Sequence, residues 1–297
     1  SRGLGDVYKR QVLSNGHGSM LLYSLLHLSG YNLSIQDLKD FRKLKSKTPG
    51  HPEFGITEGV ETTTGPLGQG IANAVGMALA EKTLAHKINT DSIQPIDHLT
   101  YCFLGDGCLM EGVSHEAMSL AGVLKLNKLI CFYDSNGISI DGKIDAWYQD
   151  DIALRCRSYG WHVIDNVDGH KRDDINLAIE EAKLSDKPTM IVCKTSIGYG
   201  AGDKQDSEAS HGAALGKEAM ATLRTNLDWP YEPFELDKQI YDSWSAVEKG
   251  IALEKEWDNL CKEFAESEPD KFHLMQRLIS GEMPDNFDSD FDKFIDD

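Results

Sequence analysis

Two loops of this chain combine glycine with oxygen-bearing side chains in a pattern that could hold a metal ion and a phosphate group. Asp106 lies between Gly105 and Gly107 after an apolar run, and Asn136 follows a second apolar run. Glycine lets a backbone approach a ligand closely, and Mg²⁺ accepts carboxylate, amide, water and phosphate oxygens. A helix predicted from Glu111 would favour diphosphate at its start. Either loop alone is more often an ordinary turn.

Alternating strands and helices would bring the two loops together. Short β-rich apolar runs predict strands, and segments of helical period predict helices. The predicted strands are 100–104, 129–133, 161–164 and 190–195, and the predicted helices are 68–87, 112–124, 152–159 and 173–184. This alternation favours an α/β fold, a parallel sheet with helices on both faces. Ligands bind outside the carboxyl ends of such strands, where Asp106 and Asn136 would lie side by side.

Three of the ten histidines lie in loops among Gly or Pro residues: His17, His51 and His211. Functional groups concentrate in loops, and imidazole exchanges protons near neutral pH. We therefore expect these three to act in the chemistry of the protein. A lone histidine elsewhere is more often structural, and we assign no function to His27, His86, His98, His115, His162, His170 and His273.

Composition excludes several classes of function. The chain has 297 residues, of which 40% are hydrophobic and 26% charged, as in a soluble globular protein with a sizeable core. No stretch approaches the roughly 18 apolar residues of a membrane helix, so we expect no membrane partner. The net charge of −18 argues against a nucleic-acid partner.

The six cysteines show no C-x-x-C spacing, and several lie inside apolar runs. We interpret them as reduced thiols of a cytoplasmic protein. Residues 1–11 are polar, lack the apolar segment of a secretory signal and join abruptly to Val12. We interpret them as a leader that could be non-native.

The C-terminal third changes in character. Apolar residues repeat at helical spacing over 239–264, which predicts one long amphipathic helix packed on the domain. After Gly281 the chain becomes acidic and poor in core residues, as in a linker. We therefore expect a cofactor-binding domain over residues 12–280, including a helical extension from about 236, and an acidic linker over 281–297.

The motifs, taken in order, resemble the transketolase family. Gly-Asp-Gly followed about 30 residues later by Asn is similar to the thiamine-diphosphate motif of that family. Further segments that resemble its signatures are 12–18, 48–53, 63–70, 105–112, 197–200 and 211–213. The resemblance implies a transketolase of the pentose phosphate pathway. Such an enzyme uses thiamine diphosphate and Mg²⁺, for which Ca²⁺ or Mn²⁺ could substitute, to transfer a two-carbon ketol unit from a ketose phosphate to an aldose phosphate.

The resemblance also implies roles for single residues in cofactor binding. Asp106, Asn136 and the carbonyl of Ile138 would hold the metal, and Gly107 would donate its N–H to the diphosphate. Four residues would contact the rest of the cofactor: Gly65 and Leu67 beside its rings, Ile140 holding its bent form and Ile197 packing nearby.

The catalytic residues follow from the same resemblance. Ketol transfer breaks a carbon–carbon bond beside a carbonyl, and the thiazolium stabilises the resulting carbanion, while imidazoles move protons on hydroxyls. His51 would touch the terminal hydroxyl of the donor sugar, and His17 and His211 would lie near the diphosphate and the reacting carbons. Glu111 resembles a family glutamate in a carboxylate network at the subunit interface.

Members of the family are longer, homodimeric, and place their sites between subunits. A pyrimidine-binding domain supplies the glutamate that starts ylid formation, and neither it nor a further C-terminal domain nor an upstream Ser-Gly-His segment is found in this sequence. We therefore expect a fragment that supplies the diphosphate and metal half of the site and is inactive alone, and favour it over a naturally split enzyme. Residues 134–137 read Asp-Ser-Asn-Gly where the family often has Asp-Asp-Asn-Lys.

Other thiamine-diphosphate enzymes remain as alternatives: a formaldehyde-accepting transketolase (dihydroxyacetone synthase), a deoxyxylulose-phosphate synthase or a dehydrogenase subunit. The segment around His51 and the Cys-Leu-Met-Glu-Gly after Gly107 favour transketolase over the last two. A non-catalytic cofactor-binding module is the alternative from a different class.

Overall fold

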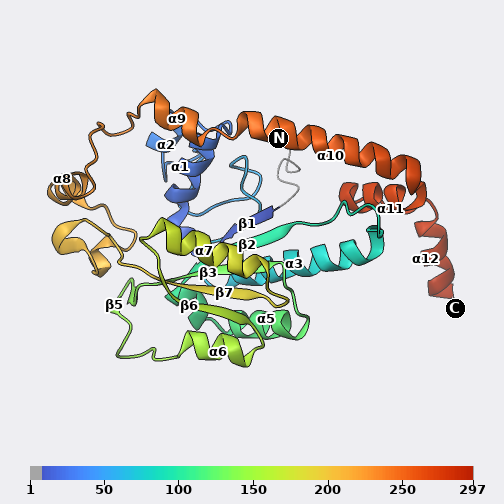
Figure 1. Ribbon diagram of the computed structural model, residues 1–297, viewed down its shortest axis with the longest axis horizontal. Coiled ribbons are helices and arrows are strands. Elements are labelled where there is room, and N and C mark those ends of the chain that lie inside the picture. Colours follow the sequence, from blue (N-terminus) through green and yellow to red (C-terminus); the bar gives the residue numbers. More distant parts are fainter. Residues whose placement is uncertain (1–8, 297) are drawn as a thin grey trace.

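A five-stranded parallel sheet forms the centre of the structure, a computed structural model that describes residues 9–296 (Figure 1). In spatial order its strands are β1 (Lys9–Leu13), β2 (Leu99–Gly105), β3 (Leu129–Ser135), β7 (Thr189–Lys194) and β6 (His162–Asp168). Four of them match the predicted strands, and the predicted α/β class with a parallel sheet is confirmed. A small antiparallel hairpin of β4 (Ile138–Ser139) and β5 (Gly142–Lys143) follows β3.

The edge strand β1 is not among the predicted strands. It includes residues 9–11 of the predicted leader and pairs with β2, with Lys9 opposite Leu99 and Leu13 opposite Phe103. Only Val12 of its five residues is buried, so the strand carries almost no hydrophobic pattern. Residues 1–8 of the predicted leader lie outside the described residues.

The register of the central strands aligns the loops that carry the predicted metal ligands. Gly105 at the end of β2 lies opposite Asp134 in β3, and Asp134 lies opposite Cys193 in β7. Because parallel strands end at the same edge, the segments after Gly105 and Ser135 leave the sheet side by side. The predicted proximity of these two loops is therefore a direct result of the pairing.

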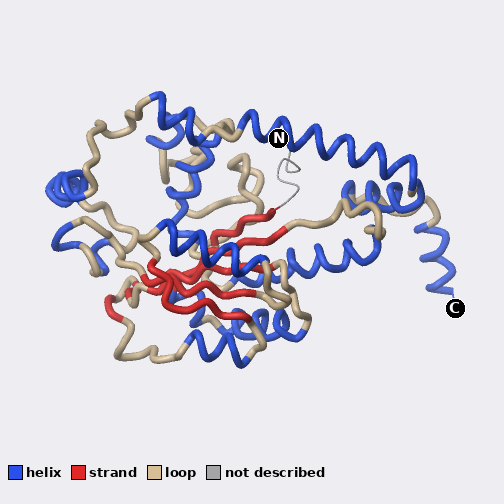
Figure 2. The backbone as a smooth tube through the Cα atoms, in the orientation of Figure 1, coloured by secondary structure: helices blue, strands red, loops and turns tan. Residues whose placement is uncertain are grey.

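Helices cover both faces of the sheet (Figures 1 and 2). Alternate residues of a strand point to opposite faces. In β3, Cys131 and Tyr133 join the core formed with α3 (Gln69–Ile88), α5 (Gly112–Val123) and α6 (Ile152–Ser158), whereas Ile130 and Phe132 face α7 (Arg172–Lys183). These four helices are the predicted ones, with ends that differ by one residue at most from the prediction.

The N-terminal helices position the loop that contains His51. After β1 the chain forms a 3-10 turn, η1 (Gly16–Gly18), then α1 (Ser19–Ser29) and α2 (Ile35–Lys39). A capping box between Ser34 and Asp37 starts α2. Tyr23 of α1 is fully buried, and its hydroxyl donates to the carbonyls of Pro49 (2.9 Å) and His51 (3.2 Å). The loop is thereby fixed to α1.

The C-terminal third is helical, as predicted, but its long helix is interrupted. It consists of α8 (Gly216–Asn226), α9 (Lys238–Trp244), α10 (Val247–Ser267), α11 (Pro269–Ser280) and α12 (Phe287–Asp296). The single helix predicted over 239–264 is wrong, because Ser245 has a non-helical ψ of 125° and the N–H of Ala246 instead donates to the Ser29 carbonyl at 3.1 Å.

This helical extension packs on the domain. Phe264 of α10 and Met275 of α11 are buried against Ile88 at the end of α3. The stretch predicted as a linker contains α12, whose residues are exposed at the end of the molecule opposite the β4–β5 hairpin (Figure 1). None of the helices in residues 9–296 is long and apolar enough to cross a membrane.

Candidate active site

The first part of the site is the turn from β2 into a short helix, α4 (Asp106–Met110). Gly105 is extended, and the chain becomes helical at Asp106. The helix predicted from Glu111 is α5, for which Glu111 is the N-cap residue, so α4 is an additional element. Asp106 therefore lies in the first turn of a helix at the carboxyl edge of the sheet.

The carboxylate of Asp106 is buried and bound on both oxygens. Its Oδ1 accepts a short hydrogen bond from the hydroxyl of Tyr133, and its Oδ2 accepts the N–H of Gly137 at 3.0 Å. Burial raises the pKa of Asp106, and these two hydrogen bonds oppose that rise. The hydrogen bond to Gly137 joins the loop after β2 directly to the loop after β3.

The loop after β3 has a fixed shape around Asn136. Its Oδ1 accepts the N–H of Ile138 at 2.9 Å, and Gly137 between them has a φ of +70°. Such a left-handed conformation suits glycine. The structure thus brings together Asp106, Asn136 and Ile138, the three expected metal ligands. Among residues 9–296 no three His, Cys, Asp or Glu side chains form a group that could hold a metal ion.

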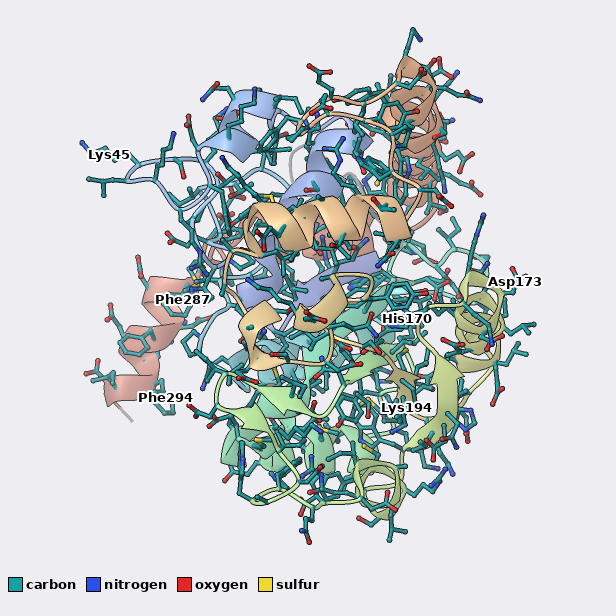
Figure 3. The ribbon with its side chains drawn as sticks, turned by 90° about the vertical axis from the view of Figure 1, so that its left-hand side faces the viewer. Lys45, His170, Asp173, Lys194, Phe287 and Phe294 are labelled. Carbon is teal, nitrogen blue, oxygen red and sulfur yellow. The ribbon has the colours of Figure 1, made fainter. Side chains whose placement is uncertain are left out.

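The end of β7 is tied to the same loop. Thr195 donates a short hydrogen bond to Oδ1 of Asp134, and Nδ2 of Asn136 donates to the other oxygen of Asp134 at 3.4 Å. Lys194 donates to the hydroxyl of Ser135 at 3.0 Å and lies on the face shown in Figure 3. Three adjacent strands therefore meet at this edge through side-chain contacts.

A close approach of three backbone segments forms the second part of the site. A Cβ added to Gly16 would lie 2.8 Å from both the amide nitrogen of Gly65 and the hydroxyl of Thr64. A Cβ on Gly107 would lie 2.9 Å from Leu67. Real Cβ atoms do not approach backbone so closely, so the loop after β1 can meet the 63–70 loop only because Gly16 has no side chain. At Gly107 the neighbour is the flexible end of the Leu67 side chain.

The three predicted histidines lie around this convergence. The rings of His17 and His211 stack with centroids 4.7 Å apart and planes at 21°. The exposed ring of His51 lies against Gly65, whose added Cβ would meet it at 3.0 to 3.2 Å. Burial, followed by the nearby His211, His51 and Arg42, lowers the pKa of His17 to about 4. His17 is therefore neutral at physiological pH.

Buried polar atoms without partners show that this region suits a polar ligand. Asn15 Oδ1, Thr64 Oγ1 and His211 Nδ1 have no hydrogen-bond partner within the described residues. Each such atom costs about 1–3 kcal/mol unless something satisfies it. The Thr64 hydroxyl and the His211 ring nitrogen can donate to phosphate oxygens, so these residues fit a diphosphate group.

The remaining predicted residues occupy different positions. Leu67 and Ile197 are half-buried, Ile197 in the loop after β7, while Ile140 is 71% exposed in the β4–β5 hairpin. Glu111 is exposed and lies against Gly68, the N-cap residue of α3. Their roles in cofactor binding and in a carboxylate network stay predictions.

Sequence reasoning missed several polar residues of the site, namely Asn15, Thr64, Tyr133 and Thr195. Asn15 and Thr64 lie inside motifs 12–18 and 63–70, in which only one histidine, one glycine and Leu67 are assigned a function. Tyr133 could have been found from strand alternation, because it shares a face with Cys131 at the end of β3, directly before the polar loop.

Comparison with known proteins identifies the family of the chain. Residues 7–284 match the family model described as transketolase, thiamine diphosphate binding domain. The chain is 56% identical over 287 residues to transketolase 1 of Escherichia coli (strain K12), covering 96% of this chain and 43% of that protein. Identity, length and coverage are the same for transketolase 1 of Pasteurella multocida (strain Pm70).

Solved structures agree as well. The transketolase of Leishmania mexicana superposes with a TM-score of 0.92 at 43% identity, covering 96% of this chain and 43% of that one. A Pichia stipitis transketolase in complex with sedoheptulose 7-phosphate also gives a TM-score of 0.92 at 43% identity, covering 97% and 43%. The fold and the site thus define a thiamine-diphosphate-binding α/β domain. The chain belongs to the transketolase family, and it spans 43% of the length of the curated relatives just described.

Proposed function

We propose that this chain supplies the diphosphate and metal half of a transketolase site. The reaction is transfer of a two-carbon ketol unit from a ketose phosphate to an aldose phosphate, as in the pentose phosphate pathway. The observation that carries the proposal is the convergence of His17, His51 and His211 on the glycine-lined loops, beside buried polar atoms without partners. Membership of the transketolase family supports this reaction.

The metal site uses oxygens of the two loops that meet at the sheet edge. Asp106, the side chain of Asn136 and the carbonyl of Ile138 are its ligands, with Mg²⁺ as the resident ion and Ca²⁺ or Mn²⁺ as substitutes. This donor set consists of oxygens alone, which is what Mg²⁺ prefers. The backbone N–H of Gly107 donates to the diphosphate, whose charge the metal offsets.

Each histidine has a distinct task that its surroundings support. Thiamine diphosphate, when bound, stabilises the carbanion left by carbon–carbon cleavage. His17, neutral because its pKa is about 4, donates one ring N–H to an oxygen without adding a charge. His51 is exposed and can reach a sugar hydroxyl, and His211 has a buried Nδ1 free to bind the cofactor or substrate.

Substrates and partners follow from the same assignment. Structures of the Pichia stipitis relative with sedoheptulose 7-phosphate, fructose 6-phosphate and xylulose 5-phosphate support sugar phosphates as substrates. The complete enzyme is a cytoplasmic homodimer in which a pyrimidine-binding domain completes the site. The unit that binds diphosphate is residues 12–280, and 281–297 leads to that domain. The exposed positions of Ile140 and Glu111 suit contacts with a second domain or subunit.

Calorimetry of the 297-residue chain with thiamine diphosphate and Mg²⁺ tests the proposal. We expect binding that requires the metal, and its loss in Asp106→Ala. Asp141→Ala, an exposed carboxylate in the β4–β5 turn, is the matched control. Unchanged metal-dependent binding in Asp106→Ala would show that the metal site is elsewhere.

An assay of ketol transfer distinguishes an enzyme from a non-catalytic binding module. We expect no ketol transfer by the chain alone and measurable transfer after addition of a pyrimidine-binding partner. Cofactor binding without turnover in the presence of that partner would favour the non-catalytic module.

A further inference from the structure

His170, which the sequence assigns to no motif, links the end of β6 to the loop after β7. Its own N–H donates to Oδ1 of Asp168 at 3.0 Å, which fixes its backbone, and its ring Nε2 accepts the N–H of Ser196 at 2.9 Å. A ring nitrogen accepts an N–H through its lone pair, so this contact favours the tautomer with the proton on Nδ1. Figure 3 shows His170 on the same face of the molecule as Lys194, the last residue of β7.

A second contact continues along the same loop. The ring of His170 stacks on that of Tyr199, with centroids 4.1 Å apart and planes at 21°. The two contacts with His170 lie on either side of Ile197 and Gly198. Ile197, the residue expected to pack near the cofactor, is therefore held from both directions by one side chain.

The loop then closes on itself before it reaches His211. The carbonyl of Ile197 accepts the N–H of Asp206 at 2.9 Å, and Ser210 packs so closely on Gly198 that an added Cβ there would lie 2.4 Å from its hydroxyl. Two short 3-10 turns, η2 (Gly202–Lys204) and η3 (Glu208–Ser210), lie within this closed segment. The base and tip of the loop are therefore joined, and these contacts connect Ser196 with His211 through Ile197, Gly198 and Ser210.

We propose that His170 is a positioning residue, which holds the Ser196 amide and the Tyr199 ring and so fixes where Ile197 and His211 lie at the cofactor site. It contacts neither cofactor nor substrate. The role of Ile197 and His211 in cofactor binding rests on the proposed function, whereas the link between His170 and their positions does not. His170 is exposed, so its replacement leaves the core intact and the variant folds.

Amide exchange and ring signals test the link without any cofactor. In the 297-residue chain with ¹⁵N-labelled serine and histidine, His170→Ala should exchange its Ser196 amide roughly threefold to tenfold faster, the equilibrium weight of one hydrogen bond. The ring signals of His17 and His211, which depend on their stacking, should shift. His170→Gln, whose Oε1 can replace Nε2 as acceptor, should restore both. His162→Ala removes the histidine at the start of β6, whose partner is Glu181, and is the control.

Cofactor affinity completes the test. If the wild-type chain binds thiamine diphosphate with Mg²⁺, His170→Ala should bind it about fivefold more weakly at unchanged thermal stability, and His170→Gln should recover most of the loss. Unchanged Ser196 exchange and unchanged His211 signals in His170→Ala would overturn the positioning role. Failure of the wild-type chain to bind the cofactor would count against the proposed function alone, because the exchange experiment decides the role of His170 independently.

Discussion

His17 stacks on His211 although the two residues are far apart in the sequence. His17 follows β1, and His211 follows the loop after β7. Neither strand neighbours the other, since β2 and β3 lie between β1 and β7. The contact therefore depends on the relative positions of β1, β2, β3 and β7 at the carboxyl edge of the sheet. It also crowds two imidazoles that would repel one another if both were charged.

Acidification should lower the free energy of unfolding, because His17 is buried beside His211 and resists protonation in the folded chain. The pKa of His17 falls from its ordinary value of 6.5 to about 4 in the fold. The unfolded chain therefore binds a proton between these values that the folded chain does not. The contribution of His17 to the free energy of unfolding is complete above pH 6.5 and declines as the pH falls toward 4.

Urea unfolding of the wild type and His17→Asn at pH 7.5 and 5 measures this contribution. The wild type should lose more stability on acidification than the variant. Burial also lowers the pKa of His98 to about 4. His98 is present in both proteins, so its effect on the free energy of unfolding cancels in the comparison. An NMR titration of His17 with a midpoint near 6.5 would contradict the prediction.

Gly16→Ala should disrupt the site, and Gly18→Ala should not. Both glycines lie in η1 with ordinary backbone angles, but a Cβ on Gly16 would meet Gly65 and Thr64 at 2.8 Å, whereas a Cβ on Gly18 meets nothing within 4 Å. Overpacking of this kind costs about 1–3 kcal/mol. Urea unfolding and calorimetric titration of the cofactor should both show the loss for Gly16→Ala only. Equal behaviour of the two variants would mean that the close approach is not required.

Tyr133→Phe should weaken metal-dependent cofactor binding while the chain stays folded. The hydroxyl of Tyr133 donates to Oδ1 of Asp106 and fixes the carboxylate that is expected to hold the metal. Loss of such a supporting hydrogen bond typically lowers metal affinity by about 10–100-fold. The measurement is calorimetric titration of thiamine diphosphate over a range of Mg²⁺ concentrations.

A second tyrosine provides the control for that experiment. Tyr159→Phe removes a hydroxyl that bonds Nδ1 of His115 at 2.9 Å, away from the carboxylate. It should leave the Mg²⁺ dependence of binding as in the wild type. A parallel weakening in both variants would indicate general loosening of the core rather than a specific role of Tyr133.

The sequence predicts the sheet well because its central strands are rich in apolar residues. The run 129–133 lies in β3, which is buried on both faces and therefore needs such a pattern, whereas the apolar run 100–104 lies in β2, which buries one face and leaves Phe103 39% exposed on the other. β1 lies at the edge and buries one residue, so the same reasoning fails there. The break between α9 and α10 also cannot be predicted from the sequence pattern, because the hydrogen bond from Ala246 to Ser29 joins distant parts of the chain.

The residues of the site also fall into those that the sequence predicts and those that it does not. Asp106 and Asn136 can be found from sequence because glycine marks their turns and strand alternation places their loops together. Thr64 and His170 cannot be assigned in this manner, since the contacts that place them near the site are made across elements. Spacing along the chain predicts which loops meet, but the partners of individual side chains follow only from the packed structure.

Arg155 of α6 should stabilise the position of α4, because it binds the C-terminal end of that helix. One guanidinium nitrogen donates to the carbonyl of Leu109 at 2.9 Å, and the other donates to Asp150 at 2.9 Å, to the hydroxyl of Tyr148 at 3.1 Å and to His115 at 3.2 Å. The side chain is 11% exposed. Hydrogen bonds made by a charged group of this kind are worth about 1.5–3 kcal/mol.

We therefore expect Arg155→Met to lower the free energy of unfolding by about 2–3 kcal/mol. Cofactor affinity should fall as well, since α4 begins at Asp106. Arg157→Met is the matched control on the same helix: its side chain is 48% exposed and lies 3.6 Å from Asp165, so its removal should change stability by less than about 0.5 kcal/mol. Urea unfolding of both variants makes the comparison, and equal losses would show that Arg155 acts as an ordinary surface charge rather than as an anchor of α4.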